Sequence, residues 1–271
     1  MPRPIRTTLP RPPRRRLRLR GPAAWWPPVS ARQDEAFRNI WQALRQHGQV
    51  QAVTLGSEKI QDRADTFVVC AIRLPRDKTA SALKPLRAAL SEFPFVRLAP
   101  AESLAITIQE LGFLVDEPQR IDEISQERIE EFVHHSSTPV CDFPRFEIRV
   151  GGFNSFLDTP FLDVHDDGWC FRMHHRLRDF TLLPVADDYA YLPHVPLGYY
   201  TRDETMRGFP ARMARWRDRT FVMFHAEALE LLAIATADPF SEPEILHRFD
   251  LGHSLGPAET ITQRGPSDVF V

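Results

Sequence analysis

Two short segments of the sequence carry side chains that could act together in catalysis. The first, Leu104-Ala105-Ile106-Thr107-Ile108, offers the hydroxyl of Thr107, and the second, residues 191–198, offers the imidazole of His194. An imidazole takes up or releases a proton near neutral pH, and a hydroxyl donates a hydrogen bond. These residue types are suited to general acid–base chemistry on a substrate held by hydrogen bonds.

Both segments have the composition of strands, and each follows a strand and a helix. The first half is expected to hold strand 66–74, helix 79–91 and strand 104–108. The second half is expected to hold strand 146–150, a short strand that ends near residue 164, helix 169–180, and strands 191–198 and 221–235. An acidic amphipathic helix, 121–135, joins the halves. Another helix is expected to begin at Ser30, because Phe37, Ile40, Trp41 and Leu44 follow at helical spacing. This internal repeat predicts an α+β fold with two similar lobes, each an antiparallel sheet with helices outside, around a central cleft.

The segments Ser103–Phe113 and Leu192–Gly198 resemble the two signature strands of the two-histidine phosphoesterases, the superfamily of the 2'-5' RNA ligases and 2',3'-cyclic phosphodiesterases. The resemblance spans about residues 66–235. In that family each lobe offers a His-x-Thr or His-x-Ser triplet, whose first and third residues share one face of a strand. The resemblance implies that the ligand is a 2',3'-cyclic phosphate or a 2'-5' linkage, at an RNA end or on a nucleotide, with no metal or organic cofactor.

Both triplets depart from the family pattern. The first reads Ala105-Ile106-Thr107 and keeps only the hydroxyl, whereas the second reads His194-Val195-Pro196 and keeps only the imidazole. The resemblance therefore assigns the catalytic role to His194 and phosphate contact to Thr107, with activity reduced or lost. The alternatives are a binding protein that retains the cleft, a slow enzyme that uses water as the second acid or base, and an enzyme that recruits another side chain.

Three further side chains are candidates for substrate binding. Gln109 follows Thr107 by two residues, so alternation predicts that it shares the same strand face. It either contacts substrate or is a polar residue at the rim of the sheet. Tyr199 and Tyr200 either stack on a base beside His194 or close the core of the second lobe.

Other histidines and motifs favour structural roles. The run His165-Asp166-Asp167-Gly168 contains ligand types for a metal, but Asp-Asp-Gly is also an ordinary turn, which we favour. His174 is expected to be a half-buried helix residue. The sequence contains no Walker-type loop, GxGxxG, GxSxG or HExxH motif.

Composition divides the chain into a tail and a folded part. Of 271 residues, 34 are basic and 36 acidic, but residues 1–33 hold nine Arg and no acid. We expect residues 1–29 to be a disordered, Arg- and Pro-rich tail that is either a nucleic-acid-binding arm or a solvated extension. The bilobed domain is expected at 30–253, with lobes at about 60–120 and 140–235, and a C-terminal tail at 254–271.

The sequence also bears on the compartment of the protein. Three widely spaced cysteines fit a reducing compartment, and no apolar stretch is long enough to span a bilayer. We therefore expect a cytoplasmic protein. If the folded part is instead an interaction scaffold, the tail would supply its nucleic-acid contacts.

Overall fold

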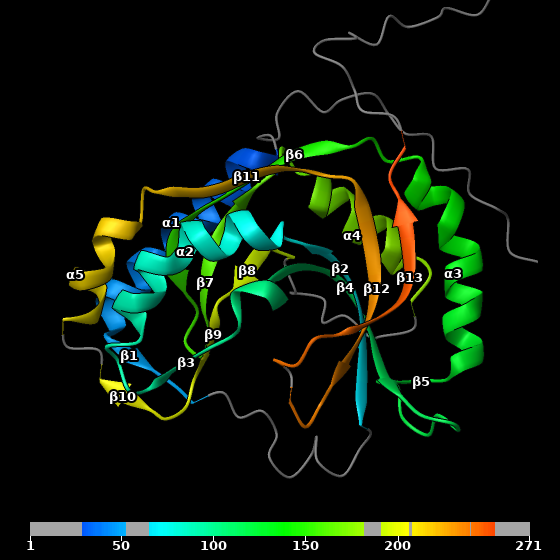
Figure 1. Cartoon of the computed structure of the whole chain (residues 1–271), viewed down its shortest axis with the longest axis horizontal. Coiled ribbons are helices and arrows are strands. Elements are labelled where there is room, and N and C mark those ends of the chain that lie inside the picture. The colour runs from blue at the N-terminus through cyan, green and yellow to red at the C-terminus, as the bar shows by residue number, and fades with distance from the viewer. Residues whose placement is uncertain (1–28, 53–64, 182–190, 206–207, 239, 253–271) are drawn as a thin grey trace, which may run out of the picture.

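The computed structural model describes residues 29–52, 65–181, 191–205, 208–238 and 240–252, so both expected tails lie outside it, apart from Val29. Two antiparallel sheets dominate the fold (Figure 1). The first has the order β13-β12-β2-β4-β5, and only its short β4–β5 pair is parallel. Its strands are β2 (Thr66–Arg73), β4 (Ala105–Leu114), β5 (Glu123–Ile124), β12 (Ala228–Ala235) and β13 (Glu244–Asp250).

The second sheet has the order β11-β6-β7-β8. Its strands are β6 (Phe146–Ser155), β7 (Pro160–His165), β8 (His194–Pro196) and β11 (Thr220–Ala226). Two small ribbons complete the strands: β1 (Gln49–Val50) pairs with β10 (Glu204–Thr205), and β3 (Val96–Leu98) pairs with β9 (Gly198–Tyr200). The mixture of helices and antiparallel sheets confirms the α+β prediction.

The repeat expected from the sequence is present in the strand order. In the first half β2 leads through helix α2 (Arg76–Leu90) to its antiparallel partner β4, and in the second half β7 leads through α4 (Trp169–Arg178) to its antiparallel partner β8. Each helix packs on the sheet of the other half, α2 against β11 and α4 against β4. The two halves therefore share one continuous core.

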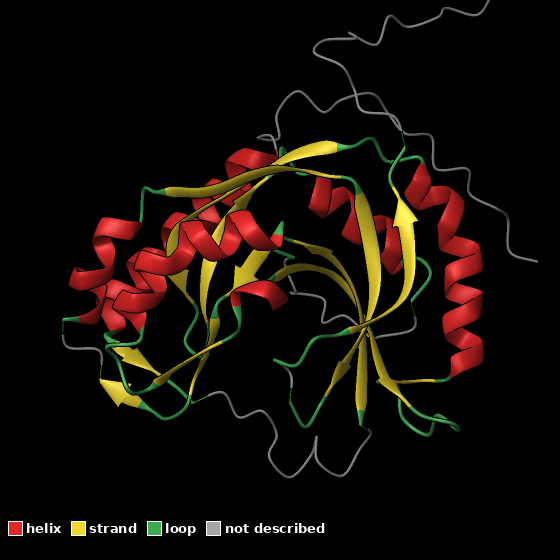
Figure 2. Ribbon diagram, in the orientation of Figure 1, coloured by secondary structure: helices red, strands yellow, loops and turns green. Residues whose placement is uncertain are grey.

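The remaining helices are α1 (Val29–His47), α3 (Gln126–Cys141) and the short α5 (Phe209–Met213). Figure 2 shows α1, α2 and α5 at one end of the molecule and α3 at the other. The expected helix after Ser30 is confirmed, because Phe37, Trp41 and Leu44 recur at helical spacing and are all buried. Gly48 ends α1 with φ +59°, in the left-handed region that glycine adopts most easily.

Two segments were each predicted to form a single strand, and this prediction is wrong, because each is divided between two strands. The segment 221–235 divides at Glu227 into β11 and β12, which pair with β6 and β2 in different sheets. The segment 191–198 likewise forms β8 in the second sheet and leads into β9, which pairs with β3. A run of apolar residues predicts extended backbone, but it does not show where the chain crosses from one sheet to another.

The pairing of β12 with β2 also means that the lobes are not contiguous in sequence. Residues 228–235, expected in the second lobe, lie in the sheet of the first. β6 is longer than expected, because it continues through Gly151-Gly152 with a register shift instead of ending there. In the described part of the chain, no helix is long and apolar enough to cross a membrane.

Candidate functional site

The two signature strands, β4 and β8, lie against each other where the two sheets meet. The hydroxyl of Tyr191, three residues before β8, donates a hydrogen bond to the backbone oxygen of Thr107 at 2.9 Å. The ring of Tyr191 also stacks on His174 of α4, with 4.2 Å between centroids. These contacts hold the approach to His194 against the strand that carries Thr107.

Thr107 lies on the face of the first sheet that is turned away from α4. Its cross-strand partner is Ala71, and Ala105 is paired with Arg73, so these four side chains share one face, which we call the Thr107 face. The alternate residues Ile106 and Ile72 point to the other face, into the main core. Among the described residues, the Thr107 hydroxyl has no hydrogen-bond partner and is half-buried, so it is free to donate to a ligand.

An ionic group lies on the same face. Glu230 on β12 pairs with Ala71, and its side chain is only 7% exposed. It accepts hydrogen bonds from Nε of Arg73 and from Nη1 of Arg248, the latter at 2.9 Å. Because a buried carboxylate is costly without partners, the two guanidinium groups account for its presence.

His194 lies on the corresponding face of the second sheet. It pairs with Asp163 on β7, and Pro196 pairs with Phe161, so these residues share the His194 face. The imidazole is half-buried and makes edge contacts with the rings of Phe156 and Phe161, at centroid distances of 5.1 and 5.2 Å. Its Nδ1 lies 2.9 Å from the backbone oxygen of Leu192.

That hydrogen bond and the burial define the chemical state of His194. A backbone oxygen can only accept, so Nδ1 carries the proton and Nε2 carries the lone pair of the neutral ring. Burial lowers the pKa of His194, although the Leu192 oxygen and the charge of Asp158 act in the opposite direction. The imidazole is therefore neutral at pH 7 and suited to accept a proton.

Asp163, the cross-strand partner of His194, is a deeply buried acid. Its side chain is 2% exposed, accepts a hydrogen bond from Asn154 Nδ2 at 3.0 Å and forms an ion pair with Arg217. Burial raises the pKa of Asp163 to about 6, because the loss of solvation outweighs the attraction of Arg217. The His194 face thus also holds a carboxyl group with a pKa of about 6.

A model of the 2'-5' RNA ligase superfamily matches residues 75–238, which is more than half of the chain. The chain belongs to the 2'-5' RNA ligase superfamily. The match includes both β4 and β8, so the strands that carry Thr107 and His194 lie within the part of the chain that the family model matches. This confirms the resemblance to the two-histidine phosphoesterases.

Solved structures show the same fold. A phosphoesterase and E. coli LigT in complex with 3'-AMP each match with a TM-score of 0.53 at 15% identity, over 69% of this chain and 99% of theirs. E. coli LigT in complex with NADP+ matches with a TM-score of 0.51 at 16% identity, over 69% of this chain and 98% of that one. The comparison with curated proteins found no match.

Gln109 does not share the Thr107 face, contrary to the expectation from alternation. The register of β4 shifts between Thr107 and Gln109, so Gln109 pairs with Cys70, which belongs to the main core. Gln109 is 4% exposed, and its Nε2 donates to the backbone oxygen of Glu110. A β-bulge adds one residue to a strand and so reverses the faces beyond it.

Tyr200 is also a core residue and not a substrate-binding one. It is fully buried, its hydroxyl lies 2.7 Å from Ser155 Oγ, and its ring packs against Phe95 and Phe209. Tyr199 is half-buried and stacks on Phe240, with the Arg97 guanidinium near both rings. Of the two tyrosines, only Tyr199 keeps part of its surface accessible.

The run His165–Gly168 and His174 make structural contacts. Asp166 accepts hydrogen bonds from the backbone N–H groups of Gly168 and Cys170 and so holds the turn before α4. Nδ1 of His174 lies 2.7 Å from the backbone oxygen of Ile108. Within the described residues, no group of three or more His, Cys, Asp or Glu side chains could hold a metal ion.

Helix α1 precedes the residues matched by the superfamily model and covers part of the His194 face. Phe37 contacts the rings of Phe161 and His165, and its backbone oxygen accepts a hydrogen bond from Asn154. Asp34 lies 2.9 Å from Nδ1 of His165. The sequence predicted this helix but not the surface on which it packs.

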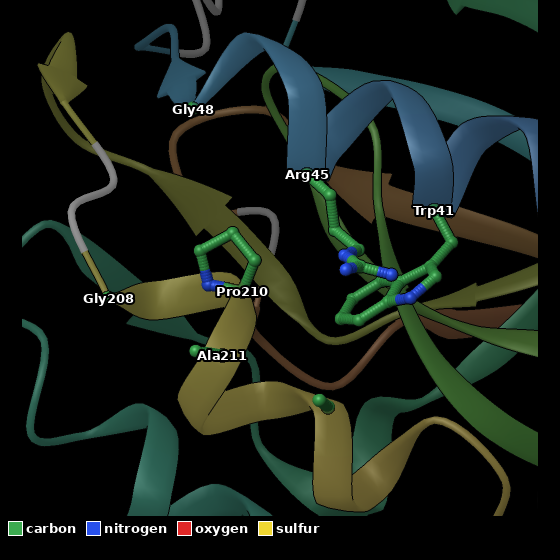
Figure 3. Close-up of a pocket in the computed structure, with 7 residues that line it drawn as sticks. Trp41, Arg45, Gly48, Gly208, Pro210 and Ala211 are labelled. Carbon is green, nitrogen blue, oxygen red and sulfur yellow. The ribbon is translucent and has the colours of Figure 1, made fainter.

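A cavity of about 440 Å³ lies between α1 and α5, where Trp41, Arg45 and Pro210 line it (Figure 3). Neither Thr107 nor His194 lines this cavity. The candidate site is therefore defined by the family strands β4 and β8 and not by this cavity.

Proposed function

We propose that this member of the 2'-5' RNA ligase superfamily binds a 2',3'-cyclic phosphate or a 2'-5' linkage, at an RNA end or on a nucleotide, and that its turnover is reduced or lost. The observation that carries the proposal is the contact between β4 and β8, which brings one hydroxyl-bearing and one imidazole-bearing strand together. Thr107 would donate to a non-bridging phosphate oxygen, and His194 would act as the base.

The ligand class is supported by the solved structures with the same fold. E. coli LigT has been crystallised with 3'-AMP and with NADP+, both of which contain a nucleotide phosphate. We propose a nucleotide phosphate as the ligand of this chain too, because Thr107 offers a free hydrogen-bond donor and Arg73 offers a cation on the same face of the sheet. No metal or organic cofactor enters the proposal.

The reduced turnover follows from what each strand lacks. Hydrolysis of a cyclic phosphate needs a base for the attacking water and an acid for the departing ribose oxygen. His194 can serve as one of them, but Ala105 carries no proton to donate, and Pro196 has neither a hydroxyl nor a backbone N–H. Loss of one acid and one donor removes about 10²–10⁴-fold and about 10²–10³-fold in rate, respectively.

The proposal is tested by turnover of a panel of 2',3'-cyclic nucleotides, with three forms of the full chain. The wild type is expected to be slow or inactive, and His194→Ala to abolish any activity that the wild type has. The double variant Ala105→His/Pro196→Thr restores both missing groups and is expected to raise the rate. Activity that survives His194→Ala would show that His194 is not the base.

The second candidate function is a non-catalytic RNA or nucleotide binding protein. It is favoured by the absence of an acid at Ala105, because a neutral His194 can serve as the base but not as the acid as well. Binding of a cyclic nucleotide without turnover in the wild type would establish it, if the double variant then gains turnover. A folded double variant without any gain would mean that the two strands no longer present their side chains to one phosphate.

A further inference from the structure

The position that lost its histidine has an arginine as its cross-strand partner. Arg73 on β2 is paired with Ala105 on β4, and antiparallel partners place their Cβ atoms about 4.5–5.5 Å apart on the same face. Thr107, paired with Ala71, is the diagonal neighbour of Arg73 on that face. Ala105 and Ala71 have only methyl side chains, so a longer side chain beside them can extend over both.

Glu230 fixes the orientation of this arginine. Its carboxylate accepts from Nε of Arg73, which leaves the two terminal NH₂ groups of the guanidinium without a hydrogen-bond partner among the described residues. The Arg73 side chain remains 20% exposed. Since Glu230 is also paired with Arg248, its single negative charge is shared between two cations.

We propose that Arg73 binds the substrate phosphate in place of the missing imidazole, and that the site therefore prefers a terminal phosphomonoester to a cyclic phosphodiester. The inference rests on the proposed function, and it deepens that function by naming the preferred ligand class: a nucleotide or RNA end that carries a 2'- or 3'-phosphate. Arg73 is a binding residue in this scheme, and Thr107 donates to the same phosphate.

The preference follows from the chemistry of the exchanged groups. A guanidinium keeps its charge in proteins and presents paired N–H donors, which suit two oxygens of one phosphate, but it cannot act as an acid. A phosphomonoester has a second pKa near 6 and carries close to two negative charges above pH 7, whereas a cyclic phosphodiester carries one. When the cation Arg73 takes the place of an imidazole that could transfer a proton, the site therefore binds the phosphomonoester product more tightly and converts the cyclic phosphodiester less readily.

The experiment is a calorimetric titration of the full chain at pH 7.5 with two probes, adenosine 3'-monophosphate and adenosine 2',3'-cyclic monophosphate. Chromatography after each titration verifies that the cyclic probe is intact. The wild type is expected to bind the monoester at least about tenfold more tightly. Arg73→Gln is expected to lose about tenfold in monoester affinity and to bind both probes alike. The monoester affinity of Arg73→Lys is expected to lie between those of the wild type and Arg73→Gln.

Two comparisons keep the test specific. Arg76→Gln removes an exposed cation only three residues away, whose partner is Glu242, and is expected to leave both affinities unchanged. Arg73→Gln should fold, because Glu230 keeps Arg248 as its partner, and thermal unfolding checks this. If Arg73→Gln nevertheless fails to fold, Arg73→Lys decides the question. A reduced preference for the monoester in Arg73→Lys supports the role of Arg73, and an unchanged preference overturns it.

The outcomes separate this inference from the proposed function. Equal affinity of the wild type for the two probes, or a preference that survives Arg73→Gln, would overturn the role of Arg73. If Thr107→Val weakens binding while Arg73→Gln does not, the proposed function stands and only this inference fails. If the wild type binds neither probe, both fail.

Discussion

Asp163 and His194 are cross-strand partners on β7 and β8, and their side chains share one face of the second sheet. Asp163 is held there by Asn154 and Arg217, whereas His194 is held by the backbone oxygen of Leu192. Although the two residues are neighbours, their side chains have different hydrogen-bond partners. Each leads to a measurable pH dependence.

We expect Asp163 to make the protein less stable as the pH rises from about 4 to about 6. Its pKa is raised from 3.8 to about 6 in the folded state, so the folded chain holds a proton that the unfolded chain has already released. The free energy of unfolding of the wild type, relative to Asp163→Asn, should fall by at most ~3 kcal/mol over this range. Urea unfolding at several pH values measures this difference.

The control for that measurement is Asp167→Asn, which changes an exposed carboxyl in the same region. It should leave the pH dependence of the wild type in place. A difference between wild type and Asp163→Asn that stays constant from pH 4 to pH 7 would contradict the raised pKa.

We expect His194 to remain neutral below pH 6.5. Burial lowers its pKa, so the imidazole keeps its lone pair at a pH where an exposed histidine is half protonated. Proton NMR titration of the full chain, with the His194 signal identified by its loss in His194→Ala, should give a midpoint below 6.5. Any wild-type turnover should decline with the same midpoint, and a midpoint above 6.5 would exclude His194 as a neutral base at this site.

Helix α1 should be part of the stable fold, although it precedes the residues matched by the superfamily model. Phe37 is 1% exposed and packs against Phe161 and His165, so Phe37→Ala should lower the free energy of unfolding by about 3–5 kcal/mol. Arg38→Ala, at the exposed neighbouring position, should change it by less than about 0.5 kcal/mol. Similar urea midpoints for the two variants would mean that α1 is not required.

Gly198 should resist substitution more strongly than Gly48. A Cβ at Gly198 would lie 1.9 Å from the backbone oxygen of Arg97 on the paired strand β3, whereas a Cβ at Gly48 would meet nothing within 4 Å. Both residues have positive φ, +151° and +59°, so both alanine variants carry backbone strain. Gly198→Ala should cost at least ~2 kcal/mol more than Gly48→Ala, for which we expect about 1–2 kcal/mol. Equal unfolding free energies would contradict the close contact of β3 with β9.

The sequence by itself determined the family, the α+β class and the two signature strands. Local information was sufficient, because Phe37, Trp41 and Leu44 fix a helical face and the triplets at Thr107 and His194 are contiguous in the chain. The missing imidazole at Ala105 and the missing hydroxyl at Pro196 were visible in the same way.

Only the tertiary structure decided which side chains surround those triplets. The bulge in β4 turned Gln109 into the core, and the crossing at Glu227 sent β12 to the first sheet, where Glu230 meets Arg73. The same pairing placed Asp163 beside His194. Cross-strand register depends on the balance of packing over whole sheets, between residues far apart in the chain, and a local pattern of residue types does not contain that information.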